Sequence, residues 1–442
     1  MARSSPRQAT RRPRSSSRLQ EAVLKALDRK RLTQTLKDLV NIPSPTGEEK
    51  AIGQYLGEQL DRLGLRVTFQ EVEAERLNVI GEWKGTGGGP TLFFGAHFDT
   101  STTGKERHLG KGHRAHAVEE DGWIYGLGVS NMKNAFAGYL MAVEMLQKAG
   151  VALKGDLIVA GVVGEIEKAP VEQYEGREYR GGGSGTLYMM HHGLTADLAI
   201  VGEPTGLRLQ PGNTGYIFAK ITTLGVPQHT YSKHLGVDAI EKMLPVMQAI
   251  KAWEPRYQQK YRHPFMKPLI GVGAIDGGYP FKPSICPAPF CNLYLHITTI
   301  PGTKPMAVRR DLEELLDGLR RRDPGLRAEV EFYLYRDGYE VPRESPVVRS
   351  VEAAHRQVTG RAVIFPEPER YAVSADCSIM HDYGVPAITY GAGGINPEGA
   401  YGMYYQDKGE CLGIEHLVTA TKVYALAALD LCSRDRAELT AR

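Results

Sequence analysis

Short runs of consecutive apolar residues recur through the first half of the chain, between segments in which apolar residues have helical spacing. The runs at 91–96, 157–163 and 198–201 predict buried strands, and the apolar stretch at 131–150 predicts a helix. Each predicted strand stops at a polar segment, and these segments are HFDT, GEIE and GEPT in turn. This pattern is typical of a parallel α/β sheet, in which ligands bind beyond the carboxyl ends of the strands.

The pattern changes near Gly212, where strand-like and helix-like segments follow in the order βαββαβ. That order predicts a ferredoxin-like α+β sandwich. We therefore expect an α/β protein with a mixed, largely parallel sheet flanked by helices, into which the sandwich is inserted. The expected first domain comprises residues 19–211 plus 339–442, and the expected inserted domain comprises residues 212–338.

Composition and charge narrow the functional class. The 442 residues carry a net charge of +3, but residues 1–18 hold six arginines and no acid, so the remainder is mildly acidic. We expect these 18 residues to be a basic disordered tail, and the acidic remainder argues against nucleic-acid binding. No apolar run of about 18 residues predicts a membrane span. Five cysteines without a C-x-x-C pair favour reduced thiols and a cytoplasmic location.

Four polar side chains at the expected strand ends are candidates for chemistry. His97 and Asp99 form an H-x-D pair, in which a carboxylate would orient an imidazole that binds a metal. Glu165 and Glu203 follow two further predicted strands. Each group alone is more often a structural histidine or a solvated carboxylate, but several of them at one buried sheet edge indicate a functional site.

Seven motifs together resemble one family of metallohydrolases. In chain order they are GAHFDT, DGWIYGLGVSNMKNAFAG, VVGEIE, DLAIVGEPT, GVPQHTYSKHLGVDAI, VSADCSIMHDYGVPAITYGAGG and DKGECLGIEHL. The family is that of glutamate carboxypeptidase, acetylornithine deacetylase, succinyl-diaminopimelate desuccinylase and aminoacylase, and the resemblance extends over about residues 35–430. It implies a phosphorylase/hydrolase-like catalytic domain, an inserted lid that also forms the dimer, and hydrolysis of carbon–nitrogen bonds in small molecules.

The family typically holds two zinc ions, and the resemblance assigns roles to the matching residues. His97 and Glu203 fall on ligands of the first ion. Glu165 falls on the general base, and Asp99 falls on the aspartate of the H-x-D motif. The first metal position and the base are therefore both retained.

The departures from the family pattern fall on the bridge and on the second ion. Asn131 replaces the aspartate that bridges both ions, and Ile166 replaces a carboxylate ligand of the second ion. Gln406 or Tyr405 stands in the place of the late histidine ligand. We therefore expect one divalent ion, zinc or manganese, held by His97 and Glu203 with Asn131 as a neutral oxygen donor. That no metal binds stays an open alternative.

The resemblance also implies an oligomer. His229 falls where the family keeps a lid histidine that reaches across a dimer interface and stabilises the oxyanion in the partner's site. We therefore expect a homodimer formed through the lid, with His229 as a catalytic residue. A surface histidine in a loop is the alternative.

The substrate pocket departs from the family as well. Thr298, in the segment HITTIPG, stands where many relatives have an arginine that binds a substrate carboxylate. Arg370 is a candidate substitute, and Tyr371 and Tyr405 are candidate substrate contacts in a tyrosine-rich segment. Tyrosines that pack loops onto the sheet are the equal alternative.

The sequence thus favours a hydrolase that uses one metal ion to cleave an amide or peptide-like bond of a small carboxylated molecule. Two alternatives stay open. One is a hydrolytic deaminase of an aromatic amino acid such as a nitroanthranilate, an activity known within the family. The other is a protein without hydrolytic activity that binds a ligand in the same cleft.

Overall fold

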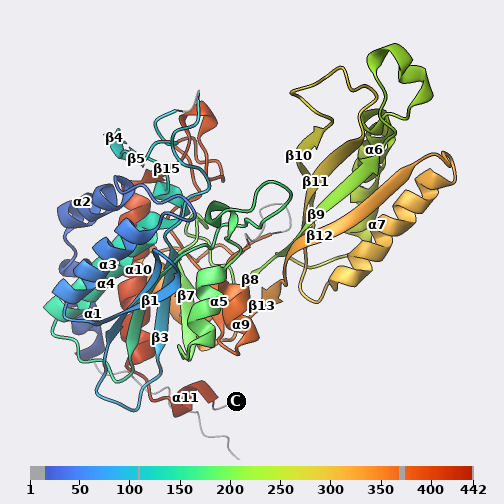
Figure 1. The fold of residues 1–442 in the computed structure, drawn as a ribbon. Coiled ribbons are helices and arrows are strands. Elements are labelled where there is room, and N and C mark those ends of the chain that lie inside the picture. Colours follow the sequence, from blue (N-terminus) through green and yellow to red (C-terminus); the bar gives the residue numbers. More distant parts are fainter. Residues whose placement is uncertain (1–14, 108–109, 368–373, 441–442) are drawn as a thin grey trace, which may run out of the picture.

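The computed structural model describes residues 15–107, 110–367 and 374–440. These residues form a larger and a smaller body, each with its own sheet and hydrophobic core (Figure 1). The chain passes between the bodies at a short paired ribbon, in which β8 (Gly212–Asn213) lies antiparallel to β13 (Tyr339–Glu340).

The larger body is built on a six-stranded sheet. Its strands follow the order β1 (Arg66–Glu73), β2 (Arg76–Trp83), β6 (Leu157–Val162), β3 (Leu92–His97), β7 (Leu198–Val201) and β14 (Ala387–Thr389). The last four strands are parallel, whereas β1 and β2 are antiparallel at one edge, which confirms the expected mixed, largely parallel sheet. Every residue of β3 is buried, as expected for a central parallel strand that is covered on both faces.

Helices cover this sheet on both sides (Figure 1). The helices of the larger body are α1 (Ser15–Lys25), α2 (Arg29–Val40), α3 (Lys50–Arg62), α4 (Asn134–Lys148), α5 (Ser184–His191), α8 (Pro346–Thr359), α9 (Cys377–Asp382), α10 (Ile414–Cys432) and α11 (Ala437–Thr440). α4 and α10 lie on one face, and α5 and α9 lie on the other (Figure 1). A small sheet of β4 (Val118–Glu120), β5 (Trp123–Tyr125) and β15 (Cys411–Gly413) lies beside them. None of the helices described is long and apolar enough to cross a membrane.

The smaller body, called the lid below, has the expected βαββαβ order. Its elements are β9 (Gly215–Leu224), α6 (Ala239–Lys260), β10 (Ile270–Gly277), β11 (Phe290–Thr299), α7 (Pro305–Arg320) and β12 (Arg327–Arg336). The strands form an antiparallel sheet in the order β10-β11-β9-β12. α7 places Val308, Leu312, Leu316 and Leu319 on one stripe, and these residues join the lid core.

Two local expectations were wrong at their boundaries. The helix α1 begins at Ser15, so the end of the segment expected to be a disordered tail is helical, because Leu19 and Val23 pack onto the core of the larger body. Residues 1–14 lie outside the described residues. The apolar helix begins at Asn134 rather than Asn131, which has φ −121° and ψ 96° and donates its N–H to Glu410.

Candidate metal and catalytic site

Three neighbouring parallel strands bring the expected site residues to one sheet edge. β3 ends at His97, while β6 and β7 end shortly before Glu165 and Glu203. Because β3 pairs with β6 on one side and with β7 on the other, the three side chains meet at the carboxyl ends of these strands.

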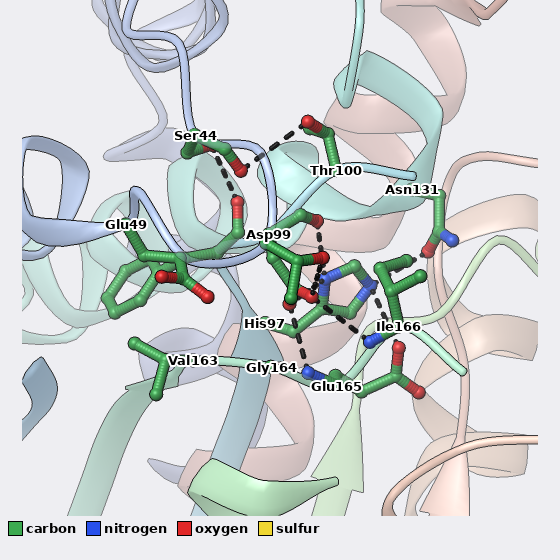
Figure 2. Close-up of polar contacts among 12 residues, drawn as sticks. Ser44, Glu49, His97, Asp99, Thr100, Asn131, Val163, Gly164, Glu165 and Ile166 are labelled. Carbon is green, nitrogen blue, oxygen red and sulfur yellow. Dashed lines mark hydrogen bonds and ion pairs between the residues drawn. The ribbon is translucent and has the colours of Figure 1, made fainter. Parts of the chain in front are cut away.

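These side chains form one compact cluster of donor atoms. One ligand atom each of His97, Glu165 and Glu203 lies within 4.8 Å of the other two, and all three residues are buried. His97 Nε2 lies 3.6 Å from Glu165 Oε2 and 3.1 Å from Asn131 Oδ1 (Figure 2). Asn131 thus presents a neutral oxygen to the same cluster.

Asp99 organises the cluster without entering it. The Nδ1–H of His97 donates to the Asp99 carbonyl oxygen at 2.9 Å, which leaves Nε2 directed at the carboxylates (Figure 2). The Asp99 carboxylate accepts the backbone N–H groups of Glu165 at 3.0 Å and Ile166 at 3.2 Å, and the Thr46 hydroxyl at 2.9 Å. Burial would raise the pKa of Asp99, but His97 and these hydrogen bonds lower it. Asp99 is therefore a positioning residue for both His97 and Glu165.

The cluster contains more carboxylates than positively charged groups. Burial would lower the pKa of His97, but the carboxylates of Glu165 and Asp99 raise it well above its usual value. Burial raises the pKa of Glu203 to about 7 and that of Glu165 well above its usual range. Glu203 Oε1 is buried without a hydrogen-bond partner among the described residues. An imidazole and two carboxylates, one with an unpaired oxygen, are a donor set that fits a divalent cation.

The turn that carries Glu165 depends on a glycine and a buried ion pair. Gly164 has φ +62°, and a Cβ at this position would lie 2.6 Å from Arg76 Nη2. Arg76 binds Glu49 through Nη2 at 2.6 Å and Nε at 3.0 Å, and both side chains are almost fully buried. Its Nη1 donates to the Arg180 carbonyl oxygen at 2.8 Å. The pair therefore links α3, β2 and the loop that follows Glu165.

Two buried carboxylates near the site were not predicted from the sequence. Asp376 lies at the start of α9, accepts the Thr186 hydroxyl and lines the same small buried space as His97. Burial raises the pKa of Asp376 to about 6. Glu410 accepts the N–H groups of Gly128, Ser130 and Asn131 at 3.0–3.1 Å, and so fixes the segment that presents Asn131. Both lie within motifs that were recognised, but their partners are distant in sequence.

Ile166, Gln406 and Tyr405 are the residues expected at the positions of the second-ion ligands. Ile166 is buried and apolar. Gln406 is exposed, and its Nε2 donates to Glu398 Oε1 at 3.1 Å. The Tyr405 hydroxyl donates to the same oxygen at 3.3 Å, and Tyr405 does not line the cavity beside the cluster, where Met403 lies instead.

A cavity of about 210 Å³ opens beside the cluster and reaches the lid. Glu165, Glu203 and Asn131 line its floor, and Lys267 and Thr298 line it from the lid. The Thr298 hydroxyl is held by Leu269, whose N–H it accepts at 2.5 Å. Thr298 therefore does not replace the missing arginine, and Lys267, which is exposed, supplies a positive charge to this cavity.

The remaining expected residues lie elsewhere. Arg370 and Tyr371 fall outside the described residues. His229 is exposed in the lid and stacks on Tyr231 with ring centroids 4.9 Å apart. The short helical segment that follows it, Thr230–Leu235, lies at the end of the lid that is remote from the larger body (Figure 1, yellow-green).

Comparisons with known proteins agree with this architecture. A model of the family described as peptidase family M20/M25/M40 matches residues 93–430. The chain is 25% identical over 434 residues to an N-formyl-4-amino-5-aminomethyl-2-methylpyrimidine deformylase of Bacillus subtilis, covering 92% of this chain and 95% of that protein. It is 28% identical over 330 residues to an acetylornithine deacetylase of Erwinia tasmaniensis, covering 72% and 80%. The structure of the dipeptidase Dug1p from Saccharomyces cerevisiae superposes with a TM-score of 0.73 at 12% identity, covering 94% and 98%.

Proposed function

Because the chain belongs to peptidase family M20/M25/M40, we propose that it is a hydrolase that cleaves an amide bond of a small carboxylated molecule with one divalent cation. The observation that carries the single cation is the cluster of His97, Glu165 and Glu203, next to which the second metal position is filled by the apolar Ile166. The deformylase and deacetylase relatives support an N-acylated substrate.

Cation binding, proton transfer and substrate recognition fall to different residues. His97 and Glu203 would hold the cation, zinc or manganese, with the Asn131 oxygen beside them. A bound cation supplies Lewis acidity, which polarises the amide carbonyl and lowers the pKa of water. Glu165 accepts the proton of the attacking water and returns it to the leaving nitrogen. Lys267 supports recognition of the substrate carboxylate.

The proposal is tested by metal analysis together with one substitution. Purified protein dialysed against zinc or manganese should retain close to one ion per chain, and two ions would refute the single-cation site. Glu165→Gln should lower kcat on an N-formyl or N-acetyl amino acid by about 10²–10⁴ while the ion is retained. Glu175→Gln, an exposed glutamate in the same loop, is the matched control. Full activity of Glu165→Gln would refute the mechanism, and release of ammonia from an aromatic amine would identify a deaminase.

A dimer through the lid completes the proposal. β10 lies at the edge of the lid sheet, and its Val272 and Ile275 are 42% and 50% exposed, which favours pairing with a second copy. In such a dimer, His229 would serve the partner's site. Mixing inactive Glu165→Gln with inactive His229→Ala should then restore part of the activity, because one site of the mixed dimer has both residues. A mixture that stays inactive despite exchange of subunits contradicts this role.

The cytoplasmic location expected from the sequence remains part of the proposal. All five cysteines are free, and four of them are buried. Unpaired thiols are usual in a reducing compartment.

A further inference from the structure

A second cavity, larger than the first, lies between the lid sheet and the loop that follows Glu165. Its volume is about 440 Å³. The lid contributes Phe218, Tyr294 and Tyr333 to its wall, and the loop contributes Tyr174 and Tyr179. Five aromatic side chains therefore line one space that the catalytic steps proposed above do not use.

One face of the lid sheet carries these rings, and the other face packs against the lid helices. Phe218 lies directly opposite His296 in the pairing of β9 with β11, and Lys220 lies opposite Tyr294, so all four side chains share one face. The alternate residues of these strands, such as Leu293 and Leu295, belong to the lid core under α6 and α7. The aromatic face is therefore the face of the lid sheet that does not pack against α6 and α7.

The loop that follows Glu165 contacts this face of the lid sheet. Lys220, on β9, forms an ion pair with Glu172 of the loop, and Val171 and Tyr174 exchange backbone hydrogen bonds at 3.0 Å. Phe218 contacts Tyr333 with ring centroids 5.7 Å apart. The ion pair of Lys220 with Glu172 therefore joins the lid face to the loop of the larger body.

The two cavities adjoin at one side chain. His296 lines the aromatic cavity and also the cavity beside the cluster. The catalytic cavity alone, at about 210 Å³, is smaller than the ~300–1,000 Å³ usual for small-molecule sites. With the adjoining 440 Å³, the space reaches that range. A substrate whose bond is cleaved at Glu165 can therefore extend past His296.

One polar group restricts what fills the aromatic cavity. Asp276 lines it, and the Tyr294 hydroxyl donates to Asp276 Oδ2 at 3.2 Å. Asp276 Oδ1 is buried and has no hydrogen-bond partner among the described residues. A buried carboxylate oxygen without a partner is costly, and a ligand with a donor group would satisfy it.

The geometry points to a substrate that carries a planar aromatic group with an amino or hydroxyl donor, bound between Phe218 and the loop tyrosines with its donor toward Asp276. This assignment rests on the proposed hydrolase function and adds the substrate class. Stacking and edge contacts with several rings supply the affinity, and Asp276 sets the orientation.

Binding to matched compounds tests the assignment. The full chain carrying Glu165→Gln, dialysed against zinc, is titrated calorimetrically with N-acetylglycine, N-benzoylglycine and N-acetylphenylalanine. At least one ring compound should bind about tenfold or more tightly than N-acetylglycine. Phe218→Leu, which keeps an apolar side chain but removes the ring, should lose most of this preference. Phe281→Leu, an 83% exposed lid aromatic outside the cavity, should keep it.

A second comparison tests the donor, and the outcomes separate the two proposals. Asp276→Asn should lose any preference for N-(4-aminobenzoyl)glycine over N-benzoylglycine while circular dichroism is unchanged. Ring compounds that bind no more tightly than N-acetylglycine, or equal effects of Phe218→Leu and Phe281→Leu, overturn the assignment. A chain that hydrolyses no amide but keeps the ring preference overturns the proposed function instead. A chain that hydrolyses N-acyl amino acids but shows no preference for ring compounds overturns the substrate assignment and leaves the proposed function intact.

Discussion

Replacing Glu49 by glutamine tests the buried ion pair behind the catalytic loop. The substitution keeps the size of the side chain but removes the charge that faces Arg76, and both residues are almost completely buried. Burial would lower the pKa of Arg76, yet its contacts with Glu49 raise it, so the guanidinium stays charged. Glu49→Gln therefore leaves a buried cation with less compensation.

The structure sets the size of the expected effect. Removing one partner of a buried ion pair costs about 3–5 kcal/mol, because the other charge stays buried. Arg76 Nη1 keeps Glu73 Oε2 at 3.3 Å and the Arg180 carbonyl oxygen at 2.8 Å. We therefore expect the lower end of that range, a loss of about 3 kcal/mol in the free energy of unfolding. Urea unfolding followed by fluorescence measures it, with an unchanged slope in denaturant.

The neighbouring residues provide a matched control. Lys50 and Glu75 are adjacent in sequence to Glu49 and Arg76, and they form an ion pair at 2.6 Å with side chains 41% and 61% exposed. Glu75→Gln should cost less than about 1 kcal/mol, because exposed pairs contribute little. Glu49→Leu combined with Arg76→Met should recover most of the loss, since no buried charge remains. Equal losses for Glu49→Gln and Glu75→Gln would refute the reasoning.

Three other outcomes are expected. Lys267→Met should raise KM for an N-acyl amino acid about tenfold with little change in kcat, measured by steady-state kinetics, because one charge-assisted contact is lost. Burial raises the pKa of Glu203 from 4.5 to about 7, so its contribution to stability is complete below pH 4.5 and is lost as the pH rises through 7. Chelator-treated protein should accordingly have a lower Tm at pH 8 than at pH 5, and Glu203→Gln should reduce the difference. Asn131→Asp should tighten cation binding in calorimetric titration, because it adds a negative charge 3.1 Å from His97 Nε2, and weaker binding would contradict that.

The strand ends of the site were predictable because their signal is local. A continuous apolar run followed by a polar residue indicates a buried parallel strand, and parallel neighbours end at the same edge. His97, Glu165 and Glu203 could therefore be brought together before any contact was known. The same applies to the βαββαβ order of the lid.

What failed depends on contacts between distant segments. The apolar helix was expected to begin at Asn131. The N–H of Asn131 instead donates to Glu410, 279 residues later, and the helix begins at Asn134. The hydroxyl of Thr46, a few residues before α3 begins at Lys50, likewise donates to Asp99, 53 residues later. The tyrosine-rich segment was expected either to contact substrate or to pack loops onto the sheet. Its Tyr390 is fully buried and forms a hydrogen bond with His355.

The aromatic cavity escaped prediction for a related reason. Phe218 and Tyr294 alternate with core residues of the lid strands, a pattern that indicates only that one face of the sheet is not in the core. The loop tyrosines that complete the wall belong to the other body. No local pattern states which loop covers which sheet.

The paired ribbon of β8 and β13 also bears on how the chain folds. β7 and β14 are neighbours in the large sheet, yet the whole lid lies between them in the chain. Closing so long a loop costs conformational entropy, whereas a lid that has already folded brings its two ends together at the ribbon. We therefore expect the lid to form early during synthesis and the last strand of the large sheet to dock afterwards, so that the sheet edge at β7 stays open until the lid is complete.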